Sequence, residues 1–150
     1  MDKKKRGKIL AVCQSKEKGT VKRVVEEGLL IEDFGLKDDA HAGKGQRQVS
    51  LLGVESIQKM QDKGFKIQYG DFAENLTVEG IVLYLLPLET KLKIGESILL
   101  EVTQIGKECH QGCEIRKKIG DCVMPREGIF ARVVKGGKVK AGDSIEVLTE

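Results

Sequence analysis

Short apolar runs separated by glycines and polar clusters dominate the chain, a pattern typical of β-strands joined by tight turns. The runs that predict strands are residues 8–13, 21–25, 29–34, 48–52, 97–102, 129–134 and 144–148. One segment has a different period, because Val54, Ile57, Met60 and Gln61 follow helical spacing between two glycines. This spacing predicts a single clear helix over residues 53–63.

A turn motif occurs twice in the second half of the chain. Residues 93–98 (KIGESI) and 140–145 (KAGDSI) each place a glycine before an acidic residue at the start of an apolar run. Both predict a sharp bend into a strand, with glycine in the strained backbone position. The adjacent Gly136 and Gly137 predict a tight hairpin turn over residues 135–138. Together these features predict a mainly β fold, a barrel with a few short peripheral α-helices.

The length and charge balance fit one soluble domain. The 150 residues are 40% hydrophobic and 33% charged, with a net charge of +3. We expect a basic N-terminal tail at residues 1–7 and a single domain over residues 8–150. The small net charge does not indicate a nucleic-acid partner, and the apolar run at residues 81–86 is too short to cross a membrane.

The N-terminus has no apolar stretch of signal-peptide length after its basic residues. We therefore expect a cytoplasmic protein with no membrane partner. The four cysteines should then be thiols, metal ligands or catalytic groups, because structural disulfides are rare in the cytosol.

Three of the cysteines lie close together in the sequence: Cys109, Cys113 and Cys122. With His110 they offer four donors for zinc, although the spacing departs from the usual paired pattern of a structural site. The lysines and Arg116 that flank Cys109 and Cys113 would instead stabilise a reactive thiolate. Inert thiols among solvated lysines are a third interpretation. The fourth cysteine, Cys13, lies in an apolar run and is predicted to be buried.

A polar loop at residues 38–47 carries a second cluster of candidate groups. His41 lies among glycines and the cations Lys44 and Arg47. Glycines allow backbone N–H groups to approach an anion, and the cations can pair with phosphate. The spacing of a P-loop is absent, so a solvated loop is the alternative. A third segment, residues 70–80, places Asn75 before an apolar run and is typical of a turn into a strand.

Taken in order, five segments of the chain resemble the MOSC domain, the module named after the C-terminal part of molybdenum cofactor sulfurase. They are residues 35–43, 47–52, 70–80, 109–113 and 128–133, the last followed by Gly142 and Asp143. The resemblance covers residues 8–148. Gly112 stands where the family usually has a proline before its functional cysteine, so Cys113 is the nearest match and Cys109 the competitor.

The resemblance implies a β-barrel that carries sulfur or handles molybdenum cofactor. It implies that Cys113 bears a persulfide or ligates molybdenum, with Cys109 as a second thiol. His41, Lys44, Arg47 and Asn75 would bind the pterin or its phosphate. The implied sulfur donor is a cysteine desulfurase, whose PLP this chain would not itself bind, and the acceptor is a molybdoenzyme or a cofactor-biosynthesis protein.

Two other functions fit the same sequence. The chain could hold intact molybdenum cofactor as a non-catalytic binding module, or it could be a domain stabilised by zinc. A reductase acting through bound cofactor would need a partner, because the chain is shorter than relatives that carry an additional domain.

Overall fold

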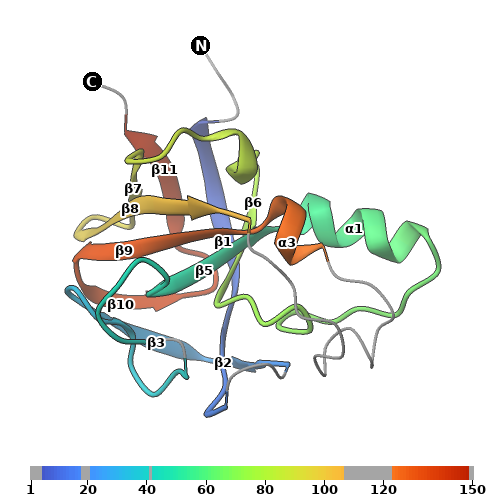
Figure 1. Ribbon diagram of the computed structural model, residues 1–150, viewed down its shortest axis with the longest axis horizontal. Helices are drawn as coiled ribbons and strands as arrows, with labels where there is room; N and C mark the ends of the chain where they lie inside the picture. Colours follow the sequence, from blue (N-terminus) through green and yellow to red (C-terminus); the bar gives the residue numbers. More distant parts are fainter. Residues whose placement is uncertain (1–4, 18–20, 41, 107–122, 149–150) are drawn as a thin grey trace.

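The computed structural model describes residues 5–17, 21–40, 42–106 and 123–148. Its main feature is a sheet that closes into a barrel, because β11 pairs with both β7 and β1. Figure 1 shows the barrel at the left and centre of the molecule, with helix α1 to one side. In order round the ring the strands are β11 (Ser144–Leu148), β7 (Lys91–Ile94), β8 (Ile98–Ile105), β9 (Ile129–Lys135), β5 (Val49–Gly53), β6 (Leu76–Glu79) and β1 (Arg6–Gln14).

The short strand β2 (Arg23–Val25) extends this sheet beyond the closure, where it pairs with β1. A second sheet holds β10 (Gly137–Lys140), β3 (Glu27–Ile31) and β4 (Gly35–Leu36), in that order. The fold prediction of a mainly β barrel with few helices is therefore confirmed. The first strand begins at Arg6, two positions before the boundary expected for the basic tail.

The barrel interior forms because apolar residues alternate along its strands. In β8, Ile98, Leu100 and Val102 are buried while their neighbours are partly exposed, the period of a half-buried strand. Burying one such side chain contributes roughly 1.5–3 kcal/mol. The barrel core contains Ile9, Val12, Leu51, Leu76, Val78, Leu92, Ile94, Ile129, Ala131, Val133 and Ile145 besides those of β8.

Helix α1 (Val54–Asp62) belongs to the crossover that connects β5 to β6. These two strands are parallel, and parallel neighbours need a long connection, usually helical. The helix buries Ile57 and Met60 in a second apolar cluster with Leu52, Phe72 and Phe130. The helix prediction is confirmed to within one residue at each end.

The turn glycines behave as the repeated motif predicts, since Gly95 and Gly142 have φ angles of +59° and +98°. The hairpin predicted at residues 135–138 is wrong. Strand β10 pairs with β3, whereas β9 pairs with β5 and β8. A Cβ on Gly136 would lie 2.1 Å from the carbonyl oxygen of Leu30, so this glycine permits the close approach by which the chain leaves one sheet for the other.

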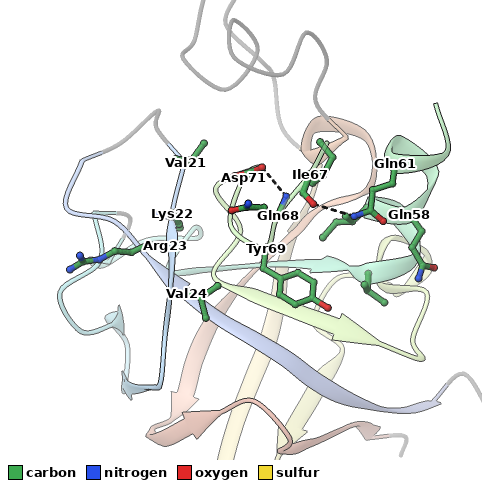
Figure 2. A pocket seen from close by; sticks show the side chains of 12 residues that line it. Val21, Lys22, Arg23, Val24, Gln58, Gln61, Ile67, Gln68, Tyr69 and Asp71 are labelled. Carbon is green, nitrogen blue, oxygen red and sulfur yellow. Dashed lines mark hydrogen bonds between the residues drawn. The ribbon is translucent and has the colours of Figure 1, made fainter. Parts of the chain in front are cut away.

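Two short helices complete the described chain: the 3-10 helix η2 (Leu83–Leu85) and α3 (Met124–Glu127). A cavity opens between β2, α1 and residues 67–71 (Figure 2). No helix in the described part of the chain is long and apolar enough to span a bilayer.

Candidate functional site

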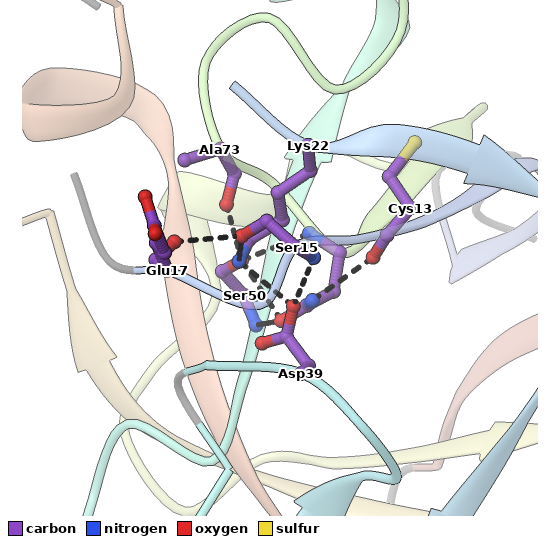
Figure 3. Close-up of polar contacts among 8 residues, drawn as sticks. Cys13, Ser15, Glu17, Lys22, Asp39, Ser50 and Ala73 are labelled. Atoms are coloured by element: carbon purple, nitrogen blue, oxygen red, sulfur yellow. Dashed lines mark hydrogen bonds and ion pairs between the residues drawn. The ribbon is translucent and has the colours of Figure 1, made fainter. Parts of the chain in front are cut away.

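A buried ion pair lies beside the end of β1 and joins Lys22, just before β2, to the start of the loop at residues 38–47. Lys22 Nζ is 2.8 Å from Asp39 Oδ1, and both side chains are 0% exposed. The backbone N–H of Ser15 donates to the same Asp39 oxygen at 3.0 Å, and Lys22 also donates to Ser15 Oγ. Figure 3 shows Ser15 and Asp39 meeting beside Lys22. This contact ties the start of the loop to the barrel.

Asn75 joins three strands through its side chain. Its Oδ1 accepts from the Ser50 backbone N–H at 2.9 Å, and its Nδ2 donates to the Cys13 carbonyl oxygen at 3.0 Å. The residue is fully buried. The geometry shows Asn75 holding β1 and β5 at the start of β6, and its predicted part in cofactor binding remains a prediction.

Glu74 is a fully buried carboxyl group beside this junction. It accepts from the backbone N–H groups of Gly70 and Phe72 at 2.8 and 3.1 Å, and from Thr77 Oγ1 at 3.2 Å. Burial raises the pKa of Glu74 to about 7, against the opposing effect of these hydrogen bonds. The carboxyl group therefore organises the turn at residues 70–74 and titrates near neutrality.

Cys13 is buried near Glu74, as the sequence predicts. Its side chain is 0% exposed, and burial, followed by the charge of Glu74, raises the pKa of its thiol to about 12. A thiol attacks as its thiolate, so Cys13 is an inert member of the core.

The candidate cations Lys44 and Arg47 lie exposed on the loop that Asp39 anchors. Arg47 Nε donates to Gln104 Oε1 at 3.1 Å, and the guanidinium lies 5.3 Å from the centre of the Phe130 ring. A second contact joins the same segments, since Thr103 Oγ1 donates to the Gln46 carbonyl oxygen. These contacts place the loop against the last residues of β8.

Gln48 fixes the other end of this loop. Its fully buried side chain donates to Asp33 Oδ1 and to the Gly45 carbonyl oxygen, and it accepts from the Val133 backbone N–H. Gly43 and Gly45 have φ angles of +146° and +139°, and open space surrounds the position of an added Cβ on each. The loop is thus held at both ends while its glycine backbone faces open space.

The cysteine candidates Cys109, Cys113 and Cys122, like His41, lie outside the described residues. The described chain ends at Gly106 and resumes at Val123, and the Gly106 N–H donates to the Gly128 carbonyl oxygen at 2.7 Å. Within the described ranges, no group of three His, Cys, Asp or Glu side chains could hold a metal ion. The predicted metal ligand Cys113 therefore remains a prediction.

Among the sequence candidates, Lys44 and Arg47 are exposed on one loop, and Asn75 is buried between strands. It also reveals the Lys22–Asp39 pair and Glu74, which sequence analysis did not identify as important. The pattern held a signal for Lys22 and Glu74 only, because a charged residue inside an apolar or glycine-framed run is a candidate for paired burial, whereas Asp39 lies in a polar loop.

The MOSC domain model matches residues 38–146 of the chain. The structure is similar to that of the YuaD protein from Bacillus subtilis, with a TM-score of 0.79 and 19% sequence identity over 95% of each chain. It is also similar to YiiM from Escherichia coli, with a TM-score of 0.65 and 18% identity over 97% of this chain and 70% of that one. YiiM from Geobacillus stearothermophilus gives 0.64 and 15%, covering 99% and 75% of the two chains. No curated protein matches the chain. At these identities the structural similarities establish the fold.

The buried ion pair generates a stability prediction. Lys22→Met should lower the free energy of unfolding by roughly 3–5 kcal/mol, because the buried Asp39 carboxylate would lose its ion pair with Lys22. The double variant Lys22→Met/Asp39→Asn should recover part of this loss, since two neutral groups replace the ion pair and the new amide oxygen can still accept from the Ser15 N–H. Urea unfolding measures both, with the exposed Lys63→Met as a control. A double variant as unstable as Lys22→Met, or less stable, would contradict this account.

Glu74 generates a pH prediction. Its pKa in the folded protein is about 7, above the ordinary value of 4.5, so between these two pH values the folded state holds a proton that the unfolded state releases. The contribution of Glu74 to the free energy of unfolding is therefore complete below about pH 4.5. It is lost as the pH rises through 7, a decrease of ~3 kcal/mol. Urea unfolding across this range should show the decrease in the wild type and not in Glu74→Gln. If the free energy of unfolding changed with pH in the same way in both proteins, Glu74 would not be the group responsible.

Proposed function

Because the chain belongs to the MOSC domain family, we propose that it carries sulfur or handles molybdenum cofactor through a thiolate of the segment at residues 109–113. The observation that carries this proposal is the contact of the Lys44–Arg47 loop with the end of β8 at Gln104. Cys109 follows Gln104 by five positions in the sequence. Five residues span at most about 18 Å, which limits how far Cys109 can lie from Gln104, and we propose that the cations and the thiol contact one ligand.

The loop supplies the anion-binding part of the proposed site. Lys44 and Arg47 are exposed, and a guanidinium fork suits a phosphate group. Gly43 and Gly45 leave the backbone open to close approach. Lys44 and Arg47 thus fit the anionic phosphate of molybdenum cofactor, and His41 is the third proposed contact on this loop. When bound, that cofactor would supply a metal centre with which a thiolate can bond.

Asn75 has a supporting part in the proposed site. Its amide is buried in hydrogen bonds to Ser50 and Cys13, so we propose that it supports the strands beneath the ligand. A direct contact with the pterin would require it to give up these bonds.

The proposed sulfur transfer is an exchange between two sulfur groups. The thiolate of Cys113, or of Cys109, attacks the terminal sulfur of a persulfide on a cysteine desulfurase. The donor S–S bond breaks as the new S–S bond forms, and the donor cysteine leaves as a thiolate. No net oxidation occurs. The acceptor, a molybdoenzyme or a cofactor-biosynthesis protein, would take the terminal sulfur by the same exchange.

The direct test is intact-mass spectrometry after incubation with a cysteine desulfurase and cysteine. The wild type should gain the mass of one sulfur atom, and Cys113→Ser should lose this gain, or Cys109→Ser if that thiol receives the sulfur. Cys122→Ser is the matched control that should load normally. Cys13 should stay unmodified because its thiol is buried and its pKa is raised to about 12. Equal loading of Cys113→Ser, Cys109→Ser and the wild type would contradict the sulfur-carrier proposal.

Metal analysis of the protein from a molybdenum-replete host separates the alternatives. Pterin bound without sulfur transfer would favour a non-catalytic cofactor-binding module. Stoichiometric zinc without pterin would favour a domain stabilised by zinc.

A further inference from the structure

The cavity between β2 and α1 has a volume of about 630 Å³, within the range of small-molecule sites. Its walls come from three separate parts of the chain: residues 21–24, the helix α1 and residues 67–71. Ile57 and Ile67 give it an apolar floor, since both are at least nine-tenths buried. None of its lining residues belongs to the loop that carries Lys44 and Arg47.

Residues 67–71 present hydrogen-bonding groups to this cavity. Asp71 Oδ2 accepts from the Gln68 backbone N–H at 2.9 Å. Within the described chain, no hydrogen bond engages Asp71 Oδ1, the side-chain amide of Gln68 or the Tyr69 hydroxyl. Figure 2 shows Gln68 and Asp71 on the side of their loop that faces Val21 and Lys22, and the Tyr69 ring below them in this view; Tyr69 and Val24 both line the cavity.

The backbone holds these groups in place. The Lys22 N–H donates to the Gly70 carbonyl oxygen at 2.7 Å, and the Gly70 N–H donates to Glu74 at 2.8 Å. Gly70 has a φ of +90°, and a Cβ there would lie 2.1 Å from the Lys22 carbonyl oxygen. The loop therefore meets a ligand in a preformed arrangement, which lowers the entropy cost of binding.

The charged side chains around the cavity indicate which kind of ligand it can bind. Lys22 turns its ammonium group inward to Asp39, and Figure 2 shows the Arg23 guanidinium directed away from Tyr69. Among the lining residues that the structure describes, Asp71 then presents its charge to the cavity beside Gln68. A carboxylate accepts two hydrogen bonds from adjacent donors, and an amide can donate to a carbonyl next to them. Tyr69 and Val24, exposed by 38% and 56%, offer flat apolar contact.

We propose that this cavity binds a neutral planar heterocycle whose edge presents an amino group, a ring N–H and a carbonyl side by side. Asp71 accepts from the amino group and the ring N–H, Gln68 donates to the carbonyl, and Tyr69 packs against the ring. Guanine presents this edge, and a guanine ligand goes beyond the proposed function.

The test uses guanosine, inosine, adenosine and neopterin as probes, with binding followed by amide NMR shifts and calorimetry. Guanosine should shift the signals of residues 21–24 and 67–71. Inosine, which lacks the amino group, should bind roughly tenfold more weakly, because one hydrogen bond to a carboxylate is lost. Adenosine, which presents a different edge, should not compete.

Asp71→Asn should remove the preference for guanosine over inosine. The new side chain can still accept from the Gln68 N–H, but it faces the ligand with an amide instead of a carboxylate. Asp62→Asn, an exposed carboxylate at the end of α1, is the matched control and should keep the preference. Absence of guanosine binding, neopterin binding in its place, or an unchanged preference in Asp71→Asn would overturn the proposal.

Sulfur loading by the desulfurase assay separates this inference from the proposed function. Asp71→Asn should load sulfur as the wild type does, because Asp71 belongs to neither the cysteine segment nor the cation loop. Loss of loading in a folded Asp71→Asn protein would contradict the assignment of two separate sites.

Discussion

Strand β1 is hydrogen-bonded along both edges, and this double pairing is the constraint from which the rest of the structure follows. At its start β1 pairs with β11, which closes the barrel, and along its length it pairs with β6 and β2. The first and last strands of the barrel are thereby joined to each other, and the first strand is also joined to β6, which lies near the middle of the sequence. A closed ring has no free edge strand, and the paired strands bury a continuous apolar interior.

The end of β1 is where the polar groups gather. The Cys13 carbonyl accepts from Asn75, and the Ser15 N–H donates to Asp39. Asp39 in turn holds Lys22 in an ion pair without solvent exposure. Buried polar groups are costly unless they are paired, so this network specifies one arrangement of β1, β2 and the loop at residues 38–47. The loop with Lys44 and Arg47 is placed by the same bonds that end the barrel strand.

The network also lies between the two regions for which we propose functions. On one side of it, Arg47 reaches Gln104 at the end of β8, where the chain continues toward the cysteines. On the other side, Lys22 and Gly70 join β2 to the turn at residues 67–74, which lines the cavity beside α1. Because Lys22 binds Asp39 through its side chain and Gly70 through its backbone, one residue links the two regions.

The sequence predicted those features that depend on local patterns. The strands at residues 8–13, 48–52 and 129–134, the helix at 53–63 and the turn glycines Gly95 and Gly142 all follow from short-range periodicity and backbone freedom. The hairpin at residues 135–138 failed because strand pairing is non-local: two adjacent glycines mark a bend but do not identify the partner strand. Here the bend sends β10 to β3 rather than back to β9.

The site was predicted less completely for the same reason. The exposed cations could be identified from their glycine-rich loop, but the Lys22–Asp39 pair joins residues 17 positions apart whose polarity suggests two solvated side chains. Glu74 likewise resembles a turn residue, and only its burial in the assembled fold explains its raised pKa. Burial of this kind depends on contacts between segments that are distant in the sequence.

The central functional claim is that the cation loop and the cysteine segment bind one ligand, and chemical cross-linking of an introduced thiol tests it most directly. Lys44→Cys should be joined to Cys109 or Cys113 by a bifunctional thiol reagent no longer than a pterin phosphate, detected by peptide mapping, because both segments would contact that ligand. Glu96→Cys, at the opposite end of β8 from Ile105, should form no such cross-link. A Lys44→Cys protein that stays unlinked, or a Glu96→Cys protein that links to the same extent, would contradict the account.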